Sequence, residues 1–391
     1  MFSAELQRLS HIVNEIESGR SDEGSLKILA DLYARVHPLA PTLEMRFGAV
    51  VMALFARADE TSRLYAAERL SEAAHLPAPL LRYLADAPIP FAIPVLEKSA
   101  HLDADQIAQA ISSFDGPRMQ AIARRNDITG DTIDLLIACG DRASVNILAR
   151  NPAAFFDHDQ TERLCARGDL LVPGAQRLLD LTPRGSLPAP GLFRYLDSAG
   201  RRTFLAALEE QPLKPAPALL VSDELRRHIA EGFVQLCRHG SDEAIAAIAR
   251  LADIPRDIVQ RGYEDAGGEM LAVLIRACDI GERALGAVLV LNEHLIGLTT
   301  ERLRALTSLH NGLSLAAAHW LTSAWSGRDA AVEMPEAASV ATVVEKLSGV
   351  SRQAIHDPAV ARPGAERRGG TQGQPRVAQP GRERQGRKNA G

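Results

Sequence analysis

HLPAPLLRYL, at residues 75–84, is the first of four related phrases that follow one another along the chain. The others are HLDADQIAQAI (101–111), DITGDTIDLLI (127–137) and FFDHDQTERLC (155–165). Each phrase has a leading apolar residue, then Pro, Asp or Thr, then a run with helical spacing. The leading residues lie 26, 26 and 28 residues apart, at Leu76, Leu102, Ile128 and Phe156. A fixed period of this kind is typical of a repeat protein.

Each phrase is predicted to begin a helix. Asp and Thr, as at Asp103 and Thr129, accept hydrogen bonds from the N–H groups of a first helical turn. Asp103 with Gln106 also has the spacing of a capping box, in which two side chains satisfy these groups reciprocally. An apolar residue before the cap should then pack against the fourth residue after it. The pairs are Leu76–Leu81, Leu102–Ile107 and Ile128–Ile133, with Phe156–Thr161 as the exception.

A second helix is expected before each phrase, because Leu70, Leu96 and Ile122 lie seven residues before the caps. Each unit is then a helical hairpin of about 26 residues, shorter than the roughly 40 residues of a HEAT unit. Helices this short become stable only by stacking on their neighbours. The sequence therefore predicts an all-α protein, an α-solenoid of short HEAT-like hairpins.

The period also suggests how the chain is divided. The phrase returns less regularly near Leu187, Ile254 and Leu298, and apolar residues have helical spacing in 4–17, 25–36 and 42–56. Residues beyond 358 are rich in Gly, Arg, Gln and Pro, a composition that buries too little apolar area to order a chain. The expected segments are an N-terminal helical cap (1–58), regular repeats (59–180), diverged repeats (181–326), a weakly structured segment (327–357) and a disordered basic tail (358–391).

Charge and cysteine usage suggest a cytoplasmic protein. The net charge is −5, but residues 359–391 hold eight Lys or Arg and two Glu, so the tail carries +6 and the rest −11. No signal peptide is visible, and no apolar run approaches the roughly 20 residues of a membrane span. The cysteines fit small core residues kept reduced, since they are far apart and lack metal-ligand spacing: Cys139, Cys165, Cys237 and Cys278.

Two stretches, RLYAAERLSEAAHLPAPLLRYLADAPIPFAIPVLEKSAHL and QAIARRNDITGDTIDLLIACGDRASVNILARNPA, carry a family resemblance. They resemble a bacterial family catalogued as domain of unknown function 2336, well over residues 60–180 and weakly to about 325. The resemblance implies short HEAT-like helical repeats. It implies no catalytic residue.

The search for catalytic and metal-binding motifs yields no candidate. Phosphate-binding, dinucleotide-binding, serine hydrolase and zinc protease signatures do not occur in the sequence, and we expect no cofactor. The run DHDQ at 157–160 offers metal ligands, but it occupies a helix start where Asp caps. His75 and His101 recur at the repeat period, and Trp320 and Trp325 are expected to close the carboxyl-terminal core.

The remaining candidate site is a basic ladder, which we define as Lys98, Arg124 and Arg150. These cations recur every 26 residues and should align on stacked hairpins, where they would bind an acidic protein or peptide. Cations also favour helix carboxyl ends for their own stability. Adjacent Arg125 is expected to point elsewhere on its helix and to serve as a control.

The sequence favours a non-catalytic scaffold or adaptor of unknown partner, because a solenoid presents a long binding surface. The alternative is a HEAT-like-repeat enzyme or nucleic-acid-binding protein, which needs a basic groove for phosphates. The acidic body disfavours nucleic acid there, whereas the basic tail could bind it. Enzymatic activity is left open.

Overall fold

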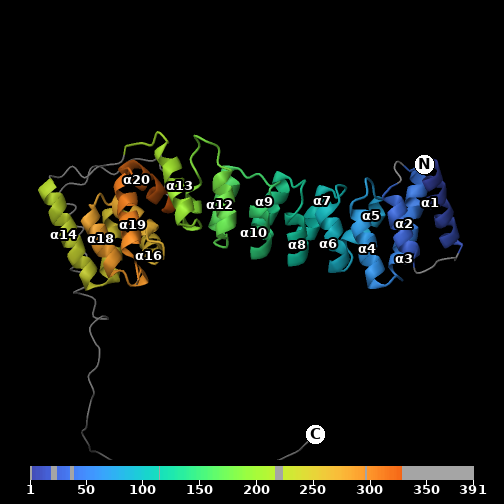
Figure 1. The fold of residues 1–391 in the computed structure, drawn as a ribbon, viewed down its shortest axis with the longest axis horizontal. Coiled ribbons are helices and arrows are strands. Elements are labelled where there is room, and N and C mark those ends of the chain that lie inside the picture. Colours follow the sequence, from blue (N-terminus) through green and yellow to red (C-terminus); the bar gives the residue numbers. More distant parts are fainter. Residues whose placement is uncertain are drawn as a thin grey trace, which may run out of the picture.

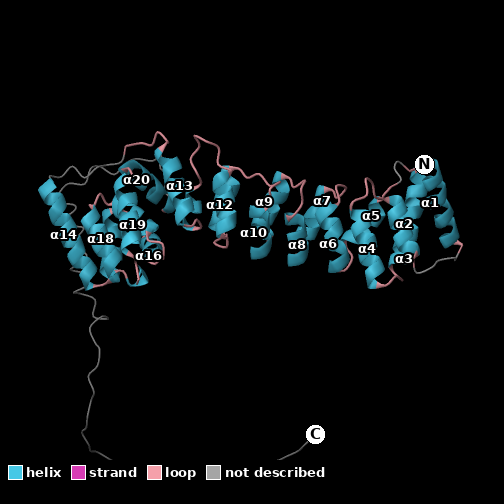
Figure 2. Cartoon of the chain, viewed as in Figure 1, coloured by secondary structure: helices cyan, strands magenta, loops and turns pink. Residues whose placement is uncertain are grey.

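The computed structural model describes residues 2–18, 24–35, 39–113, 115–215, 223–295 and 297–327. These residues form α-helices and two short 3-10 helices, and no strand occurs among them (Figure 2). The predicted all-α fold is confirmed. The expected tail at 358–391 and the expected weak segment at 327–357, apart from Gly327, lie outside the described residues.

Helices from α1 to α13 form two rows that run along a long, extended body (Figure 1). In the first row, neighbouring helices pack against each other from α1 to α5 and again from α7 to η1. In the second row, every helix packs against the next one. The first row holds α1 (Phe2–Glu17), α3 (Pro41–Phe55), α5 (Ala78–Ala85), α7 (Ala104–Ser112), α9 (Gly130–Cys139), α11 (His158–Ala166) and η1 (Pro190–Arg194). The second row holds α2 (Ser25–Tyr33), α4 (Glu60–Ser71), α6 (Ile89–Lys98), α8 (Gly116–Ala123), α10 (Arg142–Arg150), α12 (Val172–Asp180) and α13 (Ser198–Glu209).

The helix starts are those that the repeated phrase predicts. Asp103 begins α7 and Asp157 begins α11 with complete capping boxes, and Thr129 accepts from the Thr132 N–H. The DHDQ run therefore caps a helix. Leu70, Leu96 and Ile122 are fully buried between the rows. At Phe156–Thr161, the exception among the expected apolar pairs, the Thr161 hydroxyl donates to the Asp157 carbonyl, so this position serves the helix start.

One returning phrase forms a different element. The spacing at Leu187 predicts a full helix, but only the five-residue 3-10 helix η1 forms there. Asp197 caps the first turn of α13 three residues after η1 ends, which leaves no room for a longer helix. The phrases at Ile254 and Leu298 do precede α-helices, with Pro255 and Thr299 at their N-caps.

The remaining helices form a carboxyl-terminal module with a second hydrophobic core. Helix α17 runs through its interior, and all of its residues except Arg276 are buried. A helix that is apolar on every side needs partners on every side, and α16, α19 and α20 pack against it. The module consists of α14 (Asp223–His239), α15 (Ser241–Leu251), α16 (Arg256–Tyr263), α17 (Glu269–Ala277), α18 (Glu282–Leu291), η2 (Glu293–Leu295), α19 (Thr300–Gly312) and α20 (Leu315–Trp325).

Helix α20 joins this module to the two-row array. The indole Nε1–H of Trp325 donates to the Pro190 carbonyl at 3.1 Å, and its ring lies 5.5 Å from that of Phe193. Trp325 therefore closes the core where the two parts of the chain meet, as expected from its place near the end of the helical body.

Candidate partner-binding surfaces

Side chains that join neighbouring hairpins account for much of the buried polar chemistry of the array. The Arg125 side chain, only 2% exposed, donates to the Leu96 and Ser99 carbonyls at 2.8 and 2.7 Å. One repeat later, Asn151 donates to the Ala123 and Arg125 carbonyls at 2.8 and 2.7 Å. These groups satisfy the orphan carbonyls at the end of the preceding helix. They hold the stack together and are not arranged to meet a ligand.

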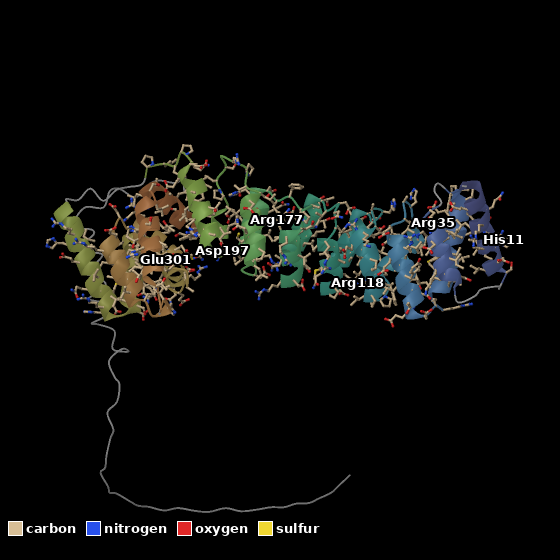
Figure 3. All side chains as sticks on the ribbon, viewed as in Figure 1. His11, Arg35, Arg118, Arg177, Asp197 and Glu301 are labelled. Carbon is tan, nitrogen blue, oxygen red and sulfur yellow. The ribbon has the colours of Figure 1, made fainter. Side chains whose placement is uncertain are left out.

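Other arginines repeat the same contact on other helices. Arg118 donates to the Ala85 and Ala87 carbonyls, and Arg177 donates to the Ala149 and Ala154 carbonyls. Both arginines are labelled in Figure 3, on α8 and α12. Arg125 makes the same kind of contact, so we group it with these arginines as joint arginines. It does point elsewhere than its exposed neighbour Arg124, as expected, but its buried contacts with the fold make it unsuitable as a control. Its guanidinium points inward because the carbonyls at the carboxyl end of α6 have no other donor within their own helix.

The basic ladder lies on three consecutive helices of the second row. Lys98 and Arg150 are the last residues of α6 and α10, and Arg124 follows the last residue of α8. All three side chains are exposed. The helices α6, α8 and α10 pack in succession, so the period places the three residues along one edge.

The surroundings of the three ladder residues differ. The Lys98 ammonium lies 3.0 Å from the Glu72 carboxylate, which raises the Lys98 pKa by hydrogen bonding to the charged form. Arg150 donates from Nε to the Asn146 carbonyl one turn back. Arg124 makes no such contact with the described residues. Lys98 is therefore partly neutralised by a neighbour, and Arg124 and Arg150 are the better candidates for a partner's carboxylates.

A buried charge cluster lies where α13 meets the carboxyl-terminal module. The Arg201 guanidinium reaches Asp265 at 2.7 and 2.9 Å and Glu269 at 3.1 Å, and Glu269 also pairs with Arg302. Glu269 is 1% exposed and Arg201 is 6% exposed. Two cations face two carboxylates, so the charges compensate each other in the interior. A Cβ at Gly267 would lie 2.3 Å from a Glu269 oxygen, which is why the chain needs glycine there.

A groove lies between α3 and α5. Its volume is about 780 Å³. Phe55 is almost fully buried beneath it, and Tyr83 and Arg82 are exposed along α5. Its other lining residues are Met52, Ala56, Arg63, Ala78, Pro79, Asp86, Ala87 and Pro88. Sequence reasoning missed this site, because Arg82 and Tyr83 depart from the repeat, which has Ala108 and Gln109 one period later.

The cysteines fit the reading as core residues. Cys165, Cys237 and Cys278 are buried, Cys139 is half-buried, and none of the four forms a disulfide. Burial raises the pKa of the Cys165 and Cys237 thiols to about 12. A thiol is a weak nucleophile when it stays protonated, so these two residues serve packing. No group of three or more potential metal ligands gathers in the described part of the chain.

The described fold is all-helical, with two rows of packed helices, and a comparison with protein families gives one match. Residues 91–236 match a family described as an uncharacterised protein conserved in bacteria (DUF2336). The predicted family resemblance is confirmed over that range, which starts later than residue 60 and ends within α14. Neither a curated protein nor a solved structure matches the chain. Within the described residues, no helix is long and apolar enough to cross a membrane.

Proposed function

We propose that the chain is a non-catalytic cytoplasmic scaffold or adaptor that binds a protein partner along the edge carrying Lys98, Arg124 and Arg150. The observation that carries this proposal is the placement of three exposed cations on three consecutive packed helices. An extended two-row array offers a long surface with a regular spacing of charge, which a folded or extended acidic partner can follow.

The use of the buried polar groups supports a binding role over a catalytic one. Arg125, Asn151 and Arg201 donate to main-chain carbonyls or to a compensating carboxylate of the fold itself. Groups committed in this way hold the helices in register. The exposed charges at the hairpin ends are the ones left for a partner.

Reversal of Arg124 and Arg150 to Glu tests the proposal. If the ladder receives an acidic partner, the double variant should bind that partner about 1 to 3 kcal/mol more weakly, chiefly through a slower association rate and most strongly at low salt. Stability should fall only by about 0.3 to 1 kcal/mol per site, because an acidic residue is unfavourable at a helix carboxyl end.

The matched control is Arg142→Glu with Arg283→Glu. Both arginines are exposed and lie in the first turn of α10 and α18, so the net charge changes equally and away from the ladder. Partners are identified by affinity purification from native cells, comparing the full chain with a chain that ends at Asp357. A partner retained by both chains, and bound equally by the ladder variant and the control, would rule out the ladder as its docking site.

A further inference from the structure

The groove between α3 and α5 contains two arginines that the fold does not use as helix-end donors. The carbonyls at the end of α5 are already satisfied, because Arg118 donates to Ala85 and Ala87 at 2.6 and 2.8 Å. Arg63 and Arg82 line the groove beside that helix end and have no acceptor among the described residues. These two guanidiniums therefore differ from the joint arginines of the array.

Arg63 is held in place without a hydrogen bond. Its guanidinium lies over the Phe91 ring, 4.9 Å from the centroid, and its Nε–H is enclosed with no acceptor. A cation above an aromatic face is attracted by the ring's quadrupole. This contact fixes the side chain at low entropic cost and leaves its outer N–H donors available. A guanidinium fixed in this way is preorganised for a planar carboxylate.

The apolar part of the groove is built from aromatic rings. Phe55 meets Tyr83 edge to face at 5.9 Å and Phe91 at 5.5 Å. Tyr83 covers Phe55 and keeps more than a third of its own surface exposed. Such a surface suits an apolar or aromatic side chain, whose burial contributes further through ring packing.

Charge and shape together indicate the occupant. The cations Arg63 and Arg82 face a single carboxylate, Asp86, within the lining. From Pro79 to Asp86 the groove follows α5 for about 10 Å, which is the length of three to four residues of extended chain. We propose that this groove binds a short acidic segment of a partner protein, with an apolar side chain on Phe55 and Tyr83 and carboxylates on Arg63 and Arg82.

This inference rests on the proposed scaffold function but not on the ladder. The groove runs along α5 and reaches Arg63 in the first turn of α4, and none of the ladder residues lines it. The ladder lies at the ends of α6, α8 and α10. The two sites would thus engage different parts of a partner, and an experiment can exclude either site without excluding the other.

The test is a selection from a displayed library of random 12-residue peptides on the full chain, followed by fluorescence anisotropy with the enriched peptides. We expect enrichment of acidic peptides that contain an aromatic or aliphatic residue. Arg82→Glu and Arg63→Gln should each weaken binding about tenfold or more, since a charge-assisted hydrogen bond is lost. Tyr83→Ala should weaken it by a similar factor.

Arg142→Glu is the matched control, because it reverses an exposed arginine two hairpins away and should leave affinity unchanged. Thermal melts check that each variant is folded. The proposal is overturned if no acidic peptide is enriched, if the groove variants bind as the wild type does, or if the groove binds single-stranded poly(U) in place of peptide. Acidic peptides lost only in the Arg124→Glu/Arg150→Glu variant would overturn the groove and leave the ladder standing.

Discussion

The regular array and the carboxyl-terminal junction solve the same problem by different chemistry. In the array, Arg125 and Asn151 bond neutral carbonyls that lie 26 to 29 residues back in the chain. At the junction, Arg201 meets Asp265 and Glu269, which are 64 and 68 residues away. Arg125 also pairs with Asp127, two residues further along the chain, so its charge is balanced locally. A joint built from such local contacts can be added with each repeat. A buried ion cluster is specific to one place, and it fixes how two separate parts of the chain fit.

The largest effect is expected from Arg201→Met at the junction. The substitution leaves Asp265 and Glu269 in the interior with only Arg302 to compensate them, and Arg302 is the more exposed of the two cations. Breaking a buried ion pair from one side typically costs about 3 to 5 kcal/mol. Urea unfolding followed by circular dichroism measures the loss. A loss under 1 kcal/mol would show that the cluster is hydrated in solution.

Core truncation within the array should cost a comparable or smaller amount. Ile122 is fully buried and Ile133 is 2% exposed, so replacement of either by Ala is expected to cost about 2 to 5 kcal/mol from lost burial and the cavity left behind. Chemical denaturation of each variant provides the value. A change below about 0.5 kcal/mol at either site would mean that the repeat register is wrong.

A joint residue should matter less than a core residue. Asn151→Ala leaves the Ala123 and Arg125 carbonyls without their donor and removes the bond that the Asn151 oxygen accepts from the Ala153 N–H. An unsatisfied buried polar group costs about 1 to 3 kcal/mol. Asn292→Ala should behave alike, since Asn292 donates to the Tyr263 carbonyl and accepts from the His294 N–H. Equal stability of both variants and the wild type would refute the joint role.

Mild acid should weaken the carboxyl-terminal module. His310 is 2% exposed, and burial lowers its pKa below the ordinary 6.5; burial also lowers the pKa of His319. As pH falls below about 6.5, these histidines become protonated in the unfolded chain but stay neutral in the folded chain. The free energy of unfolding therefore declines by up to about 1.4 kcal/mol per pH unit for each histidine.

Both tryptophans lie in α20, so their fluorescence during urea unfolding at pH 7.5 and 5.5 reports on this module. His310→Leu should reduce the acid effect, leaving the part due to His319. The same acid sensitivity in the wild type and in His310→Leu would exclude His310 as its source.

The difference between the two regions also explains how far the sequence could be read. Helix starts such as Asp103–Gln106 involve neighbours in sequence, and the period reveals the buried positions Leu70, Leu96 and Ile122. The hydrogen bonds that join neighbouring hairpins could not be predicted, because a side chain that donates to a main-chain carbonyl can do so whatever residue carries that carbonyl. A weak signal was present, because Asn151 and Asn292 each occupy the C-cap position, directly after the last residue of a helix.

The junction and the groove could not be read from the sequence for a different reason. Arg201, Asp265 and Glu269 come together only through the packing of α13 against the module. The groove depends on where α5 departs from the repeat, at Arg82 and Tyr83, and a period search discards such departures. Periodicity describes the stacked core, and sites that occur once lie outside it.

Hydrogen–deuterium exchange on the full-length Asn151→Ala variant tests most directly whether the array is held by local joints. Because each joint ties one helix end to the next hairpin, exchange should rise in α8, α10 and the helices beside them and stay at the wild-type level in α16 to α18. A uniform rise through both cores would contradict the account, since it would show that the chain opens as one cooperative unit.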